Sequence, residues 1–321
     1  MTGGLGEGDR ACLWRPMNTR FGQVRGKAGD FAAWGVMVLT PLCFSTNLIF
    51  GRGTVTEVAP ATLAFLRWSL VALVLAPFAL PAIRRGLPLG RIGLLGFLGM
   101  GICGAVVYAA LQVTTATNAT LIYTTSPVWV LLIQRLGGRP LGTFQLVGCA
   151  LAMLGVATIV FEGDGTRLLD LDLNWGDAAI LGCAIAWAVY SIAFRDDRLA
   201  ALPAAALFGI VSMAGAAILL PFALAELVAG RPMPKGADAW LGIGGIVMFS
   251  SLLAFGGYQF GLRRFGPQVT SVFMYLLPGY GVVLAIAFLG ERFKTFHAVG
   301  IALILGGVVL ATQSKARGRR W

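Results

Sequence analysis

Few side chains in this sequence of 321 residues are suited to acid–base, nucleophilic or metal chemistry. The single histidine is His297, and the five cysteines form no C-x-x-C pair. This pattern predicts no zinc site, no disulfide framework and no Ser–His nucleophile pair. We therefore expect no metal, no cofactor and no enzymatic activity.

Arg67 is the one ionisable residue that lies well inside an apolar stretch, about 9 Å from its nearer end at 1.5 Å per residue. A charge in hydrocarbon is costly, which makes it a functional candidate. Two interpretations stay open. Arg67 either anchors a ligand carboxylate, or it is structural and snorkels outward or hydrogen-bonds to carbonyl groups of a neighbouring helix.

The elements that must position such a residue are membrane helices. The chain is 57% hydrophobic and only 12% charged, which excludes a soluble globule. A bilayer core requires about 20 apolar residues per helix. Stretches of that length lie near 31–50, 62–81, 93–113, 116–135, 143–161, 175–194, 203–224, 240–260, 267–288 and 295–312. We therefore expect an all-α integral membrane protein with ten transmembrane helices.

The net charge of +11 does not indicate nucleic-acid binding, because the basic residues lie between the apolar stretches and at both ends of the chain. Eighteen of the 25 Lys and Arg residues fall in segments that share one side of the membrane if the N-terminus is cytoplasmic. By the positive-inside rule, both termini are cytoplasmic. The expected location is a bacterial inner membrane.

The sequence also contains an internal repeat. FQLVGCALAMLGVATIV from Phe144 and FHAVGIALILGGVVLAT from Phe296 are identical at seven of 17 positions. Five spans per repeat reverse the second copy in the membrane, which predicts inverted topology. The expected units are an N-terminal tail (1–29), a first repeat (30–161), an external acidic linker (162–174), a second repeat (175–313) and a basic tail (314–321).

Several stretches resemble one known family. YAALQVTTATNATLIYTTSPVWVLL (108–132) and the stretch 258–293 resemble the third-to-fourth helix signature of the drug/metabolite transporter superfamily, EamA type. The opening helix and LAFLRWSL are also similar to that family. The resemblance implies a ten-helix exporter or permease for small metabolites, often amino acids, that works by alternating access. One departure is that the Gly290-Glu291-Arg292 turn of the second half reads Gly137-Gly138-Arg139 in the first.

A substrate site is expected near the membrane midplane, between the repeats, because inverted-repeat transporters place it there. The polar stretch near 116–135 lines that site or holds helices together through hydrogen bonds. The candidate substrate-binding residues are Ser45, Asn47, Arg67, Tyr108, Thr120, Tyr123, Thr124, Trp187, Tyr190, Tyr258, Ser271 and Tyr275. Pro127 and Pro278 are candidate hinges or static kinks. Trp34, Trp68, Trp175 and Trp240 are interpreted as interfacial belt residues.

The preferred interpretation is therefore a carrier that moves small neutral or zwitterionic metabolites, amino acids first, by export or facilitated exchange. No Asp or Glu lies at mid-membrane depth, which favours transport without proton coupling. The alternatives are an exporter of lipophilic compounds and an integral-membrane enzyme acting on lipid. The expected partners are the lipid bilayer, a small-molecule substrate and a second copy of the chain in a homodimer, with no nucleic acid.

Overall fold

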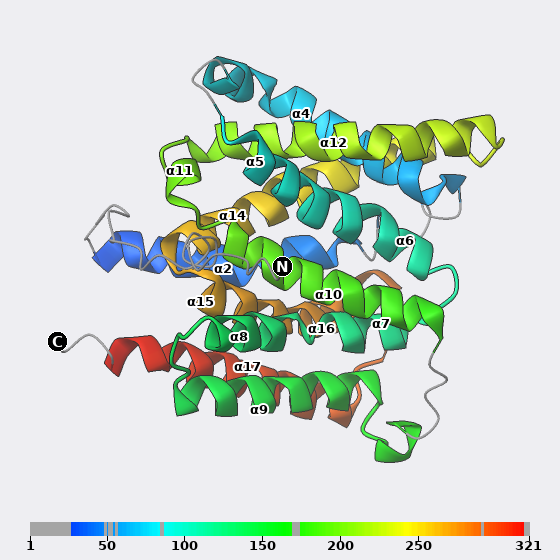
Figure 1. Cartoon of the computed structure of the whole chain (residues 1–321). Coiled ribbons are helices and arrows are strands. Elements are labelled where there is room, and N and C mark those ends of the chain that lie inside the picture. Colours follow the sequence, from blue (N-terminus) through cyan, green and yellow to red (C-terminus); the bar gives the residue numbers. More distant parts are fainter. Residues whose placement is uncertain are drawn as a thin grey trace, which may run out of the picture.

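The computed structural model describes residues 27–47, 50, 54, 57–83, 87–168, 174–289 and 292–317, and all its regular structure within these ranges is helical. Most of the two tails, residues 169–173 of the acidic linker and the Gly290-Glu291 turn lie outside the described residues. Figure 1 shows the long helices lying side by side in one bundle.

Within the described residues, eight helices are long and apolar enough to cross a membrane. Two expected spans, 31–50 and 116–135, are not among them. The first corresponds to α2 (Lys27–Ser45), whose apolar part, Phe31–Ser45, is shorter. The second is divided into α7 (Ala116–Tyr123) and α8 (Ser126–Leu136). The eight candidate spans are 60–83, 89–110, 143–160, 175–193, 204–228, 237–264, 267–288 and 295–313.

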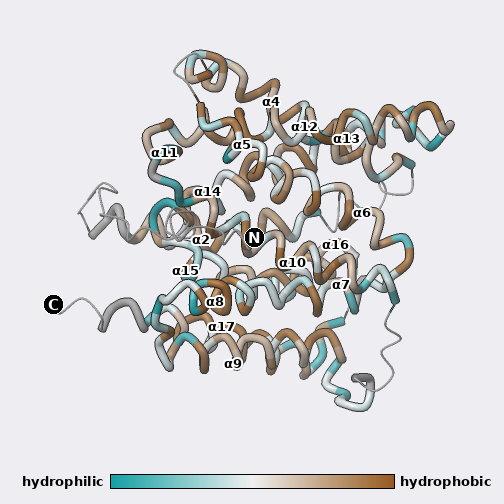
Figure 2. The backbone as a smooth tube through the Cα atoms, in the orientation of Figure 1, coloured by the Kyte–Doolittle hydropathy of each residue, from teal (hydrophilic) through white to brown (hydrophobic). Residues whose placement is uncertain are grey.

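Two helix pairs form opposite edges of the bundle. Helices α4 (Pro60–Ile83) and α12 (Ala204–Val228) pack along their lengths at one edge, and α9 (Thr143–Val160) and α17 (Thr295–Arg317) at the other (Figure 1). Glycine makes the second contact close, since a Cβ at Gly155 would lie 2.6 Å from the Gly300 carbonyl oxygen. Figure 2 shows hydrophobic residues along these helices and hydrophilic residues mostly near helix ends.

Two of the long helices change their winding partway. The first runs as α5 (Leu89–Leu95), the π-helix η1 (Gly96–Val106) and α6 (Val107–Ala110). The second runs as α13 (Ala237–Gly245), the π-helix η3 (Ile246–Leu253) and α14 (Ala254–Arg264). A π-helical turn widens the backbone, and such turns occur frequently at functional sites.

Two further helices are interrupted just before a proline. Residues Thr124 and Thr125 separate α7 from α8, and Pro127 follows in the first turn of α8. The 3-10 turn η4 (Phe273–Tyr275) separates α15 (Pro267–Val272) from α16 (Leu276–Leu289), which contains Pro278. Proline has no backbone N–H to donate, so each break lies where a helical hydrogen bond is missing.

The remaining elements are the 3-10 turn η2 (Gly165–Leu168), α10 (Trp175–Ala193) and the short helix α11 (Asp197–Ala200). Asn174 caps α10, because its side-chain oxygen accepts hydrogen bonds from Gly176 N and Asp177 N. In return, the Asp177 carboxylate accepts a hydrogen bond from Asn174 N at 2.8 Å. This reciprocal capping box satisfies backbone donors that would otherwise lack partners at the membrane surface.

Candidate functional site

The guanidinium of Arg67 is buried and bonded to two other helices. Its Nε donates to Ser251 Oγ at 2.6 Å, and its Nη2 donates to the Ser250 carbonyl oxygen at 2.9 Å. Its Nη1 donates to the hydroxyl of Tyr108 at 3.1 Å. Arg67 therefore connects α4 to the π-helix η3 and to α6, which follows η1.

No carboxylate among the described residues forms an ion pair with Arg67, whose exposed fraction is 6%. Its guanidinium carbon instead lies 4.8 Å from the ring centre of Trp68 and 5.5 Å from that of Phe255. A buried cation without a counter-ion attracts an anionic group of a ligand. The hydrogen bonds to a neighbouring helix agree with a structural role for Arg67. The anchoring role requires that no carboxylate of the protein pairs with Arg67, and none of the described residues does.

A cluster of aromatic rings lies next to Arg67. Trp187 contacts Tyr190, Tyr258 and Phe255 at ring-centre distances of 5.3, 4.7 and 5.2 Å. Phe255 also contacts Trp68 at 4.7 Å and Phe44 at 5.2 Å. The rings come from α2, α4, α10 and α14. All of them except the partly buried Phe44 are almost entirely buried, so they fill the space between these helices in this structure.

The tyrosines of this cluster have polar partners. The Tyr258 hydroxyl lies 2.8 Å from Ser191 Oγ, which itself donates to the Trp187 carbonyl oxygen. Gln259 Nε2 donates to the Tyr190 hydroxyl at 3.0 Å. The indole nitrogen of Trp68 has no hydrogen-bond partner. It is a buried donor that a ligand or a water molecule can satisfy.

The structure brings together five of the predicted site residues, Arg67, Tyr108, Trp187, Tyr190 and Tyr258. Tyr123 packs at the edge of the same apolar cluster. Ser45 joins α2 to α16, since its hydroxyl lies 3.1 Å from the Leu277 carbonyl oxygen as well as 2.9 Å from that of Pro41. Asn47 is partly buried, and its side-chain oxygen has no partner.

The other candidates lie elsewhere. Tyr275 belongs to a separate apolar cluster that includes Met37 and Cys149, and its side chain is buried there. Ser271 is buried and donates to the nearby Gln268 carbonyl oxygen at 3.3 Å. Thr124 donates to the Leu121 carbonyl oxygen at 2.8 Å, and Thr120 is exposed.

The interpretation of Trp68 as an interfacial belt residue is wrong. Its side chain is fully buried and contacts both the Phe255 ring and the guanidinium of Arg67. Trp34, Trp175 and Trp240 are 37%, 66% and 48% exposed. Position near the end of an apolar stretch does not separate these cases, because a helix end can face either lipid or protein.

Sequence reasoning missed several polar partners. Ser250, Ser251 and Gln259 lie in the expected span 240–260, which is one of the two more polar spans, but no spacing marks them. Asp177, near the start of the expected span 175–194, is a further such residue. It is buried and accepts bonds from Thr114 Oγ1 and, at 3.4 Å, from Asn118 Nδ2. The pattern Asn174-x-x-Asp177, a capping-box signature, could have indicated its first role.

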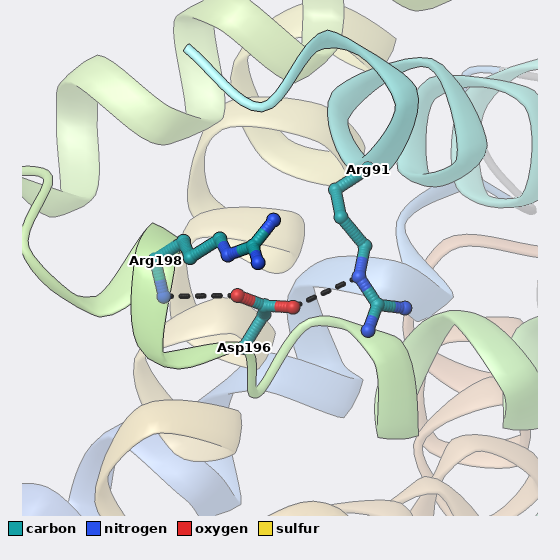
Figure 3. A network of polar contacts seen from close by, with 3 residues as sticks. All are labelled: Arg91, Asp196 and Arg198. Atoms are coloured by element: carbon teal, nitrogen blue, oxygen red, sulfur yellow. Dashed lines mark hydrogen bonds and ion pairs between the residues drawn. The ribbon is translucent and has the colours of Figure 1, made fainter. Parts of the chain in front are cut away.

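An ion pair joins the two halves at the end of the bundle where α10 ends. Arg91 Nε on α5 lies 2.8 Å from Asp196 Oδ2, and the other oxygen of Asp196 accepts from Arg198 N at 2.9 Å. Figure 3 shows the Asp196 carboxylate between these two groups. Asp196 therefore caps α11 and binds α5 at the same time.

A cavity of about 410 Å³ lies at the opposite end of the bundle. Its walls come from the start of α4, from η1 and α6, from the end of α12 and from Arg231 and Pro232. None of the predicted site residues lines it. In the part of the chain that the structure describes, no three His, Cys, Asp or Glu residues gather to form a metal site.

These features define a multi-pass helical membrane protein with a buried cation and polar groups between its helices. The sequence matches the EamA-like transporter family over residues 32–161 and again over 174–313. The chain belongs to this family of membrane transporters, within the drug/metabolite transporter superfamily that the sequence motifs resemble.

The names of individual relatives agree with this family assignment. An uncharacterized transporter of Archaeoglobus fulgidus is 28% identical over 290 residues, covering 87% of this chain and 97% of the relative. The uncharacterized inner membrane transporter YedA of Escherichia coli K12 is 28% identical, covering 77% of each chain. A probable terminal-alkyne amino-acid exporter of Streptantibioticus cattleyicolor is 28% identical, covering 69% of this chain and 74% of the relative.

A solved crystal structure shares the fold with a TM-score of 0.71 at 22% sequence identity, covering 91% of this chain and 99% of the other.

Proposed function

We propose that this protein is an alternating-access carrier for small neutral or zwitterionic metabolites, with amino acids as the leading class. The observation that carries the substrate class is the Arg67 guanidinium, which is buried, hydrogen-bonded on three nitrogens and without a carboxylate partner in the described residues. A substrate carboxylate supplies that missing charge, and the neighbouring rings suit an apolar side chain. The amino-acid exporter among the relatives supports the same class.

The proposed architecture is ten membrane helices in two inverted halves, 30–161 and 175–313, joined by an external linker at 162–174. Matched irregularities support it. Within the residues that the structure describes, each half has one π-helical stretch, η1 or η3, and one helix broken just before a proline. The helix pairs at the two edges, α4 with α12 and α9 with α17, also each combine corresponding helices of the two halves. In transporters with such symmetry, alternating access is a rocking motion of one half against the other.

The proposed location is a bacterial inner membrane with both termini in the cytoplasm. A homodimer is the proposed assembly, with the outward faces of α9 and α17 as its contact surface. These faces carry exposed apolar residues, among them Leu154 and Val309.

Flux in proteoliposomes tests the carrier. Purified protein should give saturable, counterflow-stimulated movement of a radiolabelled neutral amino acid such as leucine. Linear, non-saturating flux would indicate a channel, and no flux across a panel of neutral amino acids with transport of lipophilic cations would favour the exporter of lipophilic compounds. A pH gradient alone should not drive accumulation; uptake that collapses with a protonophore would contradict uncoupled transport.

A further inference from the structure

The cavity at the start of α4 contains two opposite charges that do not pair with each other. Glu226, near the end of α12, and Arg231, in the segment that follows, both line it. No ion pair joins them. At about 410 Å³ the cavity falls within the range of roughly 300–1,000 Å³ that is typical of small-molecule sites.

The carboxylate of Glu226 is held in one position by the other half of the molecule. Its Oε1 accepts from Ala61 N at 3.0 Å, and its Oε2 accepts from Thr62 N at 2.7 Å and from the Thr62 hydroxyl at 2.9 Å. A carboxylate offers about four acceptor positions. One position, on Oε1, therefore remains for another donor, and the three bonds pre-organise it.

Arg231 supplies the complementary group. Its side chain is exposed, and no hydrogen bond or ion pair of its guanidinium is formed within the described residues. Ala105 and Ala109, together with Val106, form an apolar wall with room for an aliphatic group. Arg67 lies seven residues further along α4 than Pro60, which is about 10 Å deeper in the membrane at 1.5 Å per residue.

We propose that this cavity is a zwitterion-binding subsite, in which Glu226 accepts from an ammonium group, Arg231 binds an acid group and the alanine wall contacts an apolar chain. The inference rests on the proposed transport function, because it makes the subsite a vestibule from which solute moves toward Arg67. The same chemistry is present in an amino acid and in the head group of phosphatidylethanolamine, so the experiment distinguishes these two sources.

The test measures binding of radiolabelled leucine to the detergent-solubilised full chain, and separately the melting temperature with and without added phosphatidylethanolamine. Arg231→Gln should weaken leucine binding by about two- to fivefold, the range of a partly exposed ion pair. Ala109→Leu, which fills the cavity, should weaken it as well. Lys235→Gln is the matched control, because Lys235 is exposed on the same segment and does not line the cavity.

Two leucine analogues identify the contacts. Competition by 4-methylpentanoate, which lacks the ammonium, should weaken in Arg231→Gln, whereas competition by 3-methylbutylamine, which lacks the carboxylate, should not change. A lipid head group is the occupant if Arg231→Gln abolishes stabilisation by phosphatidylethanolamine and leaves leucine binding unchanged. The subsite is overturned if Arg231→Gln and Lys235→Gln behave alike in both assays. Absence of flux with intact Arg231-dependent binding would refute the carrier and leave the subsite standing.

Discussion

At the scale of single residues, burial distinguishes side chains of the same type that the amino-acid composition does not distinguish. Arg67 is the clearest example, because it makes three hydrogen bonds to two other helices at a depth where water is scarce. Hydrogen bonds to charged groups contribute about 1.5–3 kcal/mol each, so the arginine geometry and not only its charge should matter.

We predict that Arg67→Lys lowers both the melting temperature and the transport rate, because a single ammonium cannot reach Ser251, Ser250 and Tyr108 together. Ser251→Ala, which removes one of these partners, should give a smaller loss. Differential scanning fluorimetry and initial uptake rates check this. A lysine variant as stable as the unmodified protein would show that the three bonds contribute little.

Within the aromatic cluster, hydroxyl deletion is a cleaner probe than alanine. Trp187 is 3% exposed, and truncating a buried aromatic residue costs about 3–5 kcal/mol through the cavity it leaves. Tyr258→Phe removes the hydroxyl, and with it the contact with Ser191, but keeps the ring. We expect it to keep the folded yield and to alter the KM for substrate. The control is alanine at Val147, which is 50% exposed on α9; an equal effect there would place the site elsewhere.

At the scale of elements, close helix packing depends on residues without side chains. A Cβ at Gly155 would also lie 2.8 Å from the backbone nitrogen of Ile304, whereas a Cβ at Gly182 on α10 would meet nothing within 4 Å. Small residues let membrane helices approach each other in this way.

Gly155→Val should therefore separate α9 from α17 and reduce the folded yield, and Gly182→Val should not. Both substitutions place valine within an apolar helix, so helix propensity cancels in the comparison. Size-exclusion profiles and melting temperatures of the two variants provide the measurement. Equal behaviour of the two would mean that this contact does not limit stability.

At the scale of the whole molecule, the halves are connected by polar contacts at both ends. Arg91 and Asp196 join them at one end, and Glu226 joins α12 to α4 at the other. The proposed alternating-access cycle requires the contacts at these two ends to loosen in turn.

We predict that Arg91→Gln and Asp196→Asn are coupled in their effect on transport, with the double variant no worse than either single one. Asparagine keeps the cap of α11, so Asp196→Asn removes the charge alone. Initial uptake rates of the four proteins form a double-mutant cycle. Additive losses would show that the pair does not act as a unit.

Orientation is a further property of the whole molecule. Reporters at Gly165 and Lys315 should lie on opposite sides of the membrane, with Lys315 in the cytoplasm, because basic residues concentrate on that side. Enzymatic reporter fusions or cysteine labelling measure this, and two reporters on the same side would exclude the proposed topology.

The sequence by itself determined that the chain is helical, membrane-embedded and a member of a transporter family, because long apolar stretches and duplicated motifs carry that information directly. It also identified Arg67, since one charge in an apolar stretch needs no structure to be noticed. Breaks at Thr124–Thr125 and at η4 follow from Pro127 and Pro278, which are visible in the sequence as well.

Only the tertiary structure decided which side chains meet. It buried Trp68, placed Tyr275 in a different cluster from Tyr258 and brought Ser250 and Ser251 to Arg67. The physical reason is that these helices are apolar on nearly all sides, so the sequence pattern does not fix which face points to lipid and which to protein. The rotation of each helix about its axis is set by packing against neighbours that are distant in the sequence.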